Sequence, residues 1–383
     1  RLTYQGVLKI SSLLLSGNAR LDNWLSKANF PGSKAIPISA TTAFSDEDAI
    51  AASSIIDLSI LLKEDGKLDW AVPPGDWTIL RVGHTPVGRM NKSAPTTGTG
   101  LDCDKFTKSA FDYHWDRMFK SILPLMRSLE DGKIGLLIDS YELGLQNWSA
   151  SFPQEFEQRK TYSLLPFLPA LTGRIIDDAA TTESFLRDFR QAQGDVMADH
   201  YYGRFTELCH ANNIVSYTEP YEGGNFEEMK IGRAVDISMG EFWAGHTMLY
   251  NNSVLDRTMK VAASIAHSKG QSIVGAEAFT AEPGSGKWQQ YPFSMKSLGD
   301  FMFTKGLTRI IFHRYAHQPH PSALPGMTMG PWGIHFDRTN TWFAKSGEWV
   351  RYLSRCQYLL RTGHFVADIA YYVGQEVPGG TIT

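Results

Sequence analysis

The chain has 383 residues, 43% of them apolar, and a formal net charge of −3 at pH 7. These values are those of an ordinary globular protein with room for a large domain and a smaller one, and they exclude a disordered or fibrous chain. Because Lys and Arg are spread along the sequence without a basic cluster, we do not expect nucleic acid or an anionic membrane as a partner.

Three cysteines, Cys103, Cys209 and Cys356, lie far apart and match neither a disulfide framework nor a metal-binding motif, so they leave the redox compartment open. No segment reaches the roughly 18 consecutive apolar residues that a membrane span needs. The chain has no initiating Met and no signal-peptide pattern. We expect a piece of a larger protein.

Residues 1–95 are predicted to form a β-rich accessory domain or insertion. Extended, β-branched segments alternate here with turn residues such as Glu64-Asp65-Gly66 and Pro73-Pro74-Gly75. The predicted strands are Leu8–Leu15, Ala35–Thr42, Ser54–Leu62 and Trp77–Val82. None of them contains an obvious catalytic motif, so we expect a structural role or contacts with carbohydrate.

From residue 96 to residue 365 the sequence alternates between helical periodicity and short apolar segments that end in polar residues. Helices are predicted at Phe106–Leu129, Phe185–Leu208, Ser253–Gly270 and Ser294–Gly306. The apolar segments, with their polar ends, are Ile134–Trp148, Val215–Glu222, Val235–Trp243, Ser272–Glu277 and Thr308–Tyr315. This alternation predicts a parallel sheet covered by helices, and it favours a (β/α)8 barrel over a doubly wound sheet. Residues 366–383 are predicted to begin a further domain.

Carboxylates follow the apolar part of most of these segments. In a parallel barrel the active site lies at the C-terminal ends of the strands. The glutamates at or just after such ends are Glu142, Glu219, Glu222, Glu241, Glu277 and Glu282. A single glutamate at a strand end is more often a salt-bridge or capping residue, but several in one barrel mouth require a cation, a shared proton or a reaction.

Paired carboxylic groups and aromatic rings are the usual equipment of glycoside hydrolysis. One carboxyl protonates the leaving oxygen, and the other attacks the sugar or activates a water molecule, while aromatic rings pack on sugar faces. The rings and imidazole near the predicted site belong to Tyr141, Trp148, Tyr221, Trp243, His313 and Tyr315. Rival chemistries have no support, since the sequence contains no G-x-S-x-G, Walker, HExxH or Rossmann glycine motif.

Several segments resemble the α-L-rhamnosidases of glycoside hydrolase family 106, and the resemblance extends over nearly the whole chain. They are PPGDWTILRVGHTPVG (73–88), IDSYELGLQNW (138–148), LTGRIIDD (171–178), FLRDFR (185–190), GEFW (240–243) and GAEAFT (275–280). The resemblance implies a (β/α)8 catalytic domain, an inverting mechanism and a calcium ion that helps to hold the rhamnose hydroxyls. It also implies a bacterial enzyme, secreted or periplasmic, that acts on rhamnose-containing pectic or other plant polysaccharides.

The same resemblance implies an incomplete barrel. The strand that ends near Glu142 would be the fourth, and those ending near Glu219, Glu241, Glu277 and His313 would be the fifth to eighth. Five strands cannot close a barrel. Either the first three strands lie N-terminal to the β-rich insertion in the same full-length protein, or a partner fragment supplies them.

Roles carried over from the family make Glu142 the general acid and Glu277 the general base, with the reverse assignment open. Glu241 would support the attacking water or touch the metal, and Glu219 and Glu222 are further metal candidates. The metal ligands themselves are not identified by spacing. The expected substrate contacts are Asp139, Tyr141, Asn147, Trp148, Glu219, Tyr221, Trp243, His313 and Tyr315. We also expect Arg314 and His317 to contact the sugar or acidic groups of a pectic substrate.

Two other functions remain open on the sequence. The chain could be a non-catalytic carbohydrate-binding fragment in which the missing strands leave the site incomplete. It could also be a retaining β-glycosidase of the barrel type, in which Glu277 would be the nucleophile.

Overall fold

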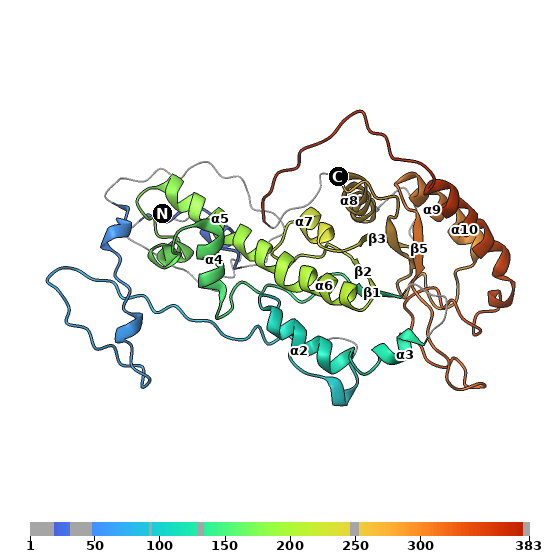
Figure 1. The fold of residues 1–383 in the computed structure, drawn as a ribbon, viewed down its shortest axis with the longest axis horizontal. Coiled ribbons are helices and arrows are strands. Elements are labelled where there is room, and N and C mark those ends of the chain that lie inside the picture. Colours follow the sequence, from blue (N-terminus) through green and yellow to red (C-terminus); the bar gives the residue numbers. More distant parts are fainter. Residues whose placement is uncertain (1–18, 31–47, 92–93, 129–133, 246–252, 378–383) are drawn as a thin grey trace, which may run out of the picture. The chain divides into compact units, whose positions relative to one another are not determined.

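The computed structural model describes residues 19–30, 48–91, 94–128, 134–245 and 253–377 (Figure 1). The chain forms two compact units. The first comprises Arg1–Gly83 with Phe156–Phe189, and the second comprises His84–Glu155 with Arg190–Thr383.

The second unit contains one five-stranded parallel sheet with the strand order β1-β2-β3-β4-β5. The strands are β1 Gly135–Ile138, β2 Val215–Thr218, β3 Ile237–Trp243, β4 Gly275–Thr280 and β5 Arg309–Phe312. Four of the strands lie inside segments predicted from the sequence, and β4 begins inside the predicted segment Ser272–Glu277 but continues to Thr280. Because sequential strands are neighbours and helices connect them, the unit is an α/β fold with a half-barrel sheet. The predicted parallel sheet is confirmed.

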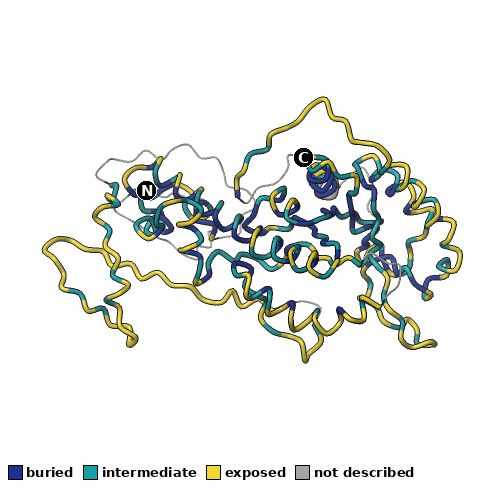
Figure 2. Tube along the Cα trace, in the orientation of Figure 1, coloured by how far each residue is buried: buried dark blue, intermediate teal, exposed yellow. Residues whose placement is uncertain are grey.

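Helices separate the strands along the chain (Figure 1). They are α6 Arg204–Ala211 before β2, α7 Glu228–Arg233 before β3, α8 Ser253–Ser268 before β4, α9 Pro292–Thr304 before β5 and α10 Gly347–Leu360 after it. A large buried cluster lies around β3 and β4 and the helices α8, α9 and α10, and much of the chain there is dark blue in Figure 2. Phe242, Met259, Phe279, Met302 and Trp349 are among its large buried side chains. In contrast, β1 and β5 contain no buried residue.

Gly240 explains how closely α8 packs on β3. A Cβ atom added to Gly240 would lie 2.8 Å from the backbone nitrogen of Met259 on α8. A larger residue would force the helix away from the strand. The small residue beside Glu241 is therefore required by helix packing.

Two predicted helices are each divided into separate helical elements in the structure. The helix predicted over Phe106–Leu129 is interrupted, since α2 Lys108–Met118 ends before α3 Leu123–Arg127 begins. Pro124 stands in the first turn of α3, where proline is tolerated because its missing N–H would be unpaired anyway. The second prediction, Phe185–Leu208, corresponds to α5 Ala179–Met197, followed directly by a π-helical segment, Ala198–Gly203, and by α6.

The first unit has helical turns where strands were predicted. Its elements are α1 Trp24–Lys27, 3-10 turns at Ala52–Ser54, Ser59–Leu61 and Leu165–Thr172, and the last turns of α4 Phe152–Lys160 together with the start of α5. Leu21 donates from its backbone nitrogen to Gly173 at 2.8 Å, and Ile50 pairs with Ile176 in a parallel bridge. These contacts join the N-terminal residues to a later segment, 156–189, which sequence periodicity does not assign to the same unit.

The prediction of a strand at Ser54–Leu62 is wrong. Asp57 accepts a hydrogen bond from the backbone nitrogen of Ser59 at 2.8 Å, which favours a local turn over a ladder. Trp77–Val82 is likewise not a strand. The predicted turn at Glu64–Gly66 is present, with Leu62 and Leu68 bridged across it. The predicted strands Leu8–Leu15 and Ala35–Thr42 lie outside the described residues.

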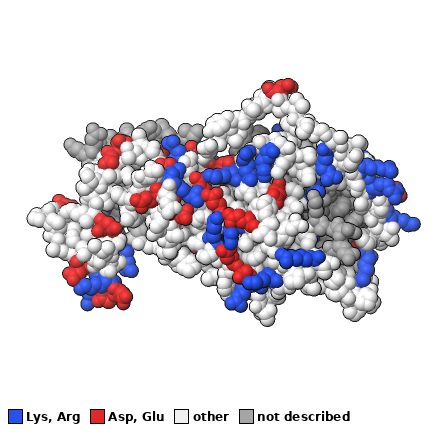
Figure 3. Space-filling model, in the orientation of Figure 1, with Lys and Arg blue, Asp and Glu red and all other residues white. Residues whose placement is uncertain are grey.

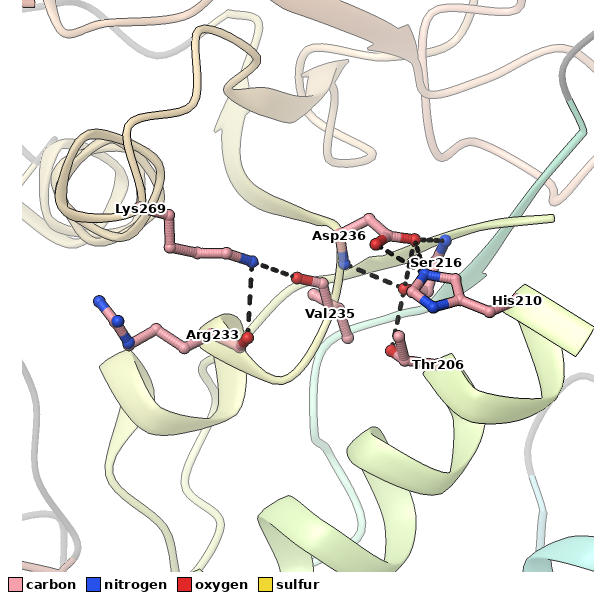
Figure 4. Close-up of polar contacts among 7 residues, drawn as sticks. All are labelled: Thr206, His210, Ser216, Arg233, Val235, Asp236 and Lys269. Atoms are coloured by element: carbon pink, nitrogen blue, oxygen red, sulfur yellow. Dashed lines mark hydrogen bonds and ion pairs between the residues drawn. The ribbon is translucent and has the colours of Figure 1, made fainter. Parts of the chain in front are cut away.

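A polar network joins α6 to the starts of β2 and β3 (Figure 4). Asp236 accepts hydrogen bonds from the backbone nitrogen and the hydroxyl of Ser216, at 2.8 and 3.0 Å, and lies 2.9 Å from Nε2 of His210. The hydroxyl of Thr206 is 2.9 Å from that of Ser216. Since this network lies at the N-terminal ends of the strands, it serves stability rather than catalysis.

The surface of the described residues carries charges of both signs. On the face drawn in Figure 3, acidic and basic side chains are interspersed. No helix within the described part of the chain is long and apolar enough to cross a membrane. Residues 366–377 contain no helix or strand, and Tyr371 and Tyr372 in this segment are exposed.

Candidate active site

Three carboxyl groups converge at the C-terminal ends of the strands. Asp139 directly follows β1, Glu219 directly follows β2, and Glu277 lies within β4. One oxygen from each of these side chains lies within 4.8 Å of the other two. Residues far apart in the sequence thus form one acidic cluster, because parallel strands end at the same edge of the sheet.

Glu219 is the most deeply buried member of this cluster, with 1% of its surface exposed. Its backbone nitrogen donates to Ile138 at 3.2 Å, which ties the end of β2 to β1. Neither carboxyl oxygen has a hydrogen-bond partner among the described residues. Burial raises the pKa of this carboxyl well above its ordinary value, and the charges of Asp139 and Glu277 raise it further. Such a group must keep its proton or face a cation.

Glu277 is held by a local irregularity of β4. Pairing with β3 joins Phe242 to Ala278 and then Trp243 to Thr280, so Phe279 is an extra residue with a φ of 64°. In a regular strand, residues three apart point to opposite faces, and this bulge places Thr280 on the side of Glu277. The Thr280 hydroxyl donates a hydrogen bond to the Glu277 carboxylate.

The electrostatic surroundings of Glu277 favour its protonated form. Its pKa is raised to about 8, chiefly by burial. The hydrogen bond from Thr280 opposes this shift, whereas the charges of Glu241, Asp139 and Glu142 increase it. His313 Nδ1 lies 3.9 Å from Glu277 Oε1. Burial lowers the pKa of His313, with Arg314 adding to that effect and Asp139 opposing it.

Glu241 stands beside Glu277 on β3. The indole N–H of Trp243 donates a hydrogen bond to the Glu241 carboxylate. The backbone nitrogen of Glu241 donates to the hydroxyl of Thr258 on α8 at 3.1 Å. Burial raises the pKa of Glu241, the hydrogen bond from Trp243 opposes the shift, and the charge of Glu222 adds to it. Glu222 therefore lies within electrostatic reach of Glu241, at a left-handed position with a φ of 81°.

Glu142 occupies the loop after β1 and is exposed. The hydroxyl of Ser140 donates to its carboxylate at 3.1 Å. Glu142 is not one of the three clustered groups, but its charge contributes to the raised pKa of Glu277. The two catalytic carboxyls predicted from the sequence, Glu142 and Glu277, therefore interact electrostatically. Glu142 is exposed, whereas Glu277 is largely buried.

Two of the aromatic residues predicted to contact the substrate are buried in the protein. Tyr141 and Tyr221 are 4% and 0% exposed, and the backbone nitrogen of Tyr141 donates to the carbonyl of Tyr221 at 3.0 Å. Tyr141 packs edge-to-face on Phe226 at 5.6 Å. The pKa of Tyr221 is raised well above its ordinary value by burial and then by the charges of Glu219 and Glu241, so its hydroxyl borders the carboxylates.

Two further predicted substrate contacts, Asn147 and Trp148, interact with other residues of the protein. Trp148 packs on Phe152 at 5.5 Å and on His84 at 6.4 Å, and the carbonyl of Asn147 accepts from Gln193 at 3.1 Å. These contacts belong to the loop that follows β1.

Residues after β5 add an exposed ring, an imidazole and a guanidinium. Tyr315 is 61% exposed, and His317 is also exposed. Arg314 has two buried nitrogens, Nε and Nη2, without hydrogen-bond partners among the described residues, and burial lowers the pKa of its guanidinium.

Comparison with known proteins places this arrangement in a family. The family model described as alpha-L-rhamnosidase, glycoside hydrolase family 106, matches residues 5–383. The chain belongs to this family. Its strand-end carboxylates therefore lie in the fold of a glycoside hydrolase, as the sequence segments predicted.

A solved structure supports the same family. The rhamnosidase from Novosphingobium sp. PP1Y superposes with a TM-score of 0.80 at 30% identity, covering 95% of this chain and 35% of that one. A protein of Formosa agariphila, provisionally named a beta-glucuronidase, is 41% identical over 349 residues, which are 91% of this chain and 28% of that protein. The chain thus spans about a third of each relative's length or less.

Within this glycoside hydrolase family, the acidic cluster fits a hard cation. Asp139, Glu219 and Glu277 offer only oxygen ligands, which calcium prefers. The two buried oxygens of Glu219 lack donors among the described residues. A cation would satisfy both oxygens and remove the repulsion between the three groups.

Some residues of the site escaped prediction from the sequence. Thr280 and Thr258 support Glu277 and Glu241, and Trp332 packs edge-to-face on Trp243 at 5.9 Å. The position of Thr280 depends on the bulge, and that of Thr258 depends on the helix packing at Gly240. Trp332 lies in an irregular loop, where no periodicity could have indicated it.

Proposed function

We propose that the protein containing this chain removes α-L-rhamnose from plant or pectic glycans by an inverting, two-carboxylate, calcium-assisted hydrolysis. The observation that carries the proposal is the convergence of Asp139, Glu219 and Glu277 at the strand ends, with Glu142 in electrostatic reach. Membership of the rhamnosidase family supports the choice of sugar.

In this proposal Glu142 is the general acid and Glu277 the general base. Glu142 donates its proton to the glycosidic oxygen as the bond to the anomeric carbon breaks, and Glu277 takes a proton from the water that attacks that carbon. Glu241, held by Trp243, orients the water or contacts the metal. Glu222 adds negative charge beside Glu241.

The role of Glu277 depends on whether the cluster holds a cation. With a pKa of about 8, Glu277 carries its proton at pH 7 and could only donate. We propose that calcium is held by Asp139, Glu219 and Glu277, and that when bound it supplies positive charge for the sugar hydroxyls and favours ionised carboxylates. Without a cation, the reverse assignment, with Glu277 as the acid, follows from the same raised pKa.

The substrate contacts in this proposal come from the loops after the strands. Asn147 and Trp148 would line the pocket after β1, and His313 and Tyr315 would do so after β5. Arg314, whose buried nitrogens lack partners among the described residues, supports an acidic, pectic substrate. We propose a bacterial protein that is secreted or periplasmic, because its polymeric substrates lie outside the cell.

We also propose that β1 to β5 are strands four to eight of a complete (β/α)8 barrel, with residues 1–95 as an insertion. The remaining strands would belong to the same full-length protein. The proposal is supported by the fold similarity to the Novosphingobium rhamnosidase, of which this chain covers 35%.

A second candidate is a β-glucuronidase activity, favoured by the 41% identity to the Formosa protein. In its retaining form, Glu277 would attack the anomeric carbon directly and form a covalent glycosyl-enzyme. A raised pKa of about 8 is unfavourable for that role unless a nearby positive charge lowers it.

The test is hydrolysis of p-nitrophenyl α-L-rhamnoside and p-nitrophenyl β-D-glucuronide by the complete polypeptide, with and without a chelator. Turnover of the rhamnoside that falls with chelator and returns with calcium supports the proposal. NMR of the first-formed product should show the inverted anomer. Turnover of the glucuronide alone would establish the second candidate, and binding of sugar without turnover of either would indicate a carbohydrate-binding fragment.

A further inference from the structure

Trp332 has an exposed indole ring, and one other ring, that of Trp243, lies between it and the carboxylate of Glu241. It is 39% exposed and meets Trp243 edge-to-face, with 5.9 Å between ring centroids and an angle of 89°. The N–H of Trp243 in turn donates to Glu241. The indole of Trp332 therefore borders the site but lies outside the acidic cluster.

The loop around Trp332 is held on both sides. The backbone nitrogen of Gly333 donates to Ala281, just after β4, at 2.8 Å, and that of Ile334 donates to His313, just after β5, at 3.2 Å. Gly333 has a φ of 81°, and a Cβ atom added there would lie 3.2 Å from the His313 carbonyl oxygen. The loop is thus anchored to the two strand ends that also carry Glu277 and His313.

Close packing also positions the residue before Trp332. A Cβ atom on Gly286 would lie 2.2 Å from the carbonyl oxygen of Pro331, so only glycine allows the loop after β4 to pass this close. Specific contacts therefore fix the backbone on either side of the exposed Trp332 indole. A large apolar ring at an ordinary surface position does not require such contacts. Binding residues are characteristically placed in this way.

We propose that Trp332 is the stacking platform for the second ring of the substrate, the pyranose on the leaving-group side of the scissile bond. The clustered carboxylates lie at the strand ends and would hold the sugar that is cleaved, so a ring on the more exposed Trp332 belongs to the next unit outward. An indole face packs against the apolar C–H face of a pyranose. This inference rests on the proposed function, because it assigns a further subsite to that site.

The test uses the complete polypeptide with Trp332→Ala, Trp332→Phe and a matched control, Trp77→Ala. Trp77 is 40% exposed and packs edge-to-face on Trp70 at 5.3 Å, so it has the same exposure and ring geometry in the other unit. Binding is measured by calorimetry for free L-rhamnose and for an α-L-rhamnosyl disaccharide. Hydrolysis of the disaccharide gives kcat and KM separately.

Trp332→Ala should weaken disaccharide binding and raise KM by about five- to tenfold, with kcat and rhamnose binding changed less than about twofold. Trp332→Phe should restore most of the affinity, and Trp77→Ala should change neither quantity. Equal losses for rhamnose and disaccharide, or no loss for either, would overturn the proposal. If the wild-type protein cleaves only glucuronides, the proposed rhamnosidase function is wrong. The Trp332 proposal is then tested with a β-glucuronosyl disaccharide in place of the rhamnosyl disaccharide. Wild-type protein that binds neither disaccharide refutes both proposals.

Discussion

Glu241 and Glu277 are register partners on the adjacent strands β3 and β4, so their side chains leave the sheet on the same side. Burial raises the pKa of each, and the charge of Glu241 is one cause of the shift at Glu277. Each carboxylate is oriented by one donor, Trp243 for the first and Thr280 for the second. Like-charged groups held in this way are characteristic of catalytic and cation sites.

Replacing Glu277 by Gln should lower kcat by about 10²- to 10⁴-fold, because the amide cannot exchange the proton that the reaction requires. Steady-state rates on p-nitrophenyl α-L-rhamnoside measure this change. Glu348→Gln, at an 82% exposed position on α10, is the control and should keep the wild-type rate. A loss of less than about tenfold in Glu277→Gln would remove Glu277 from the catalytic pair.

Replacing Glu142 by Gln should slow substrates with poor leaving groups far more than activated ones. A 2,4-dinitrophenyl leaving group needs no proton, so its release should stay within about tenfold of the wild-type rate, whereas a disaccharide should slow by about 10²-fold or more. Glu277→Gln should slow both alike. The opposite pattern in the two variants would establish the reverse assignment, with Glu277 as the acid.

Calcium should raise the melting temperature of the wild-type protein but not that of Glu219→Gln. Ligand at about 100 times its Kd stabilises a folded protein by about 2.7 kcal/mol. The amide of Gln removes one of the charged ligands while keeping the side-chain shape. Thermal unfolding with chelator, calcium or magnesium checks this expectation, and an equal calcium shift in both proteins would place the ion elsewhere.

The Asp236 network should make stability depend on pH in the acid range. Burial raises the pKa of Asp236, but hydrogen bonds from Ser216 and His210 outweigh it, so the net shift is downward. For a carboxyl whose folded pKa is depressed, the stabilisation is present above the unfolded value of about 3.9 and is lost as pH falls through the folded value.

Asp236→Asn should therefore lower the free energy of unfolding by about 1 kcal/mol at pH 7, and the difference from wild type should vanish in strong acid. Urea unfolding at a series of pH values measures it. Asp368→Asn, at an exposed position in the C-terminal segment, should show no such difference. A constant difference down to pH 2 would mean that the Asp236 charge does not contribute.

Gly240→Ala should destabilise the second unit by about 1–3 kcal/mol, because its Cβ would press on the backbone of Met259. Gly100→Ala is the control, since an added Cβ there meets nothing within 4 Å. Thermal unfolding separates the two variants. A stable Gly240→Ala protein with a raised KM would instead mean that this glycine makes room for substrate.

Much of the fold followed from local patterns in the sequence. The five strands and the helices between them were predicted because apolar periodicity is decided by residues a few positions apart, and β2 begins at Val215 as expected. Ser54–Leu62 was predicted wrongly because its β-forming residues find no partner strand among the described residues, and the side chain of Asp57 stabilises a turn. Strand propensity is realised only where a neighbour supplies the ladder.

The sequence by itself determined which residue types stand at the strand ends, and hence the kind of chemistry. Only the tertiary structure decided their environments. It buried Glu219 close to Asp139 and Glu277, left Glu142 exposed, and brought Thr280 to Glu277 through an extra residue in β4. The reason is that burial, register and the pKa shifts that follow from them arise from strands and loops that are distant in the chain, and no local pattern records those distances.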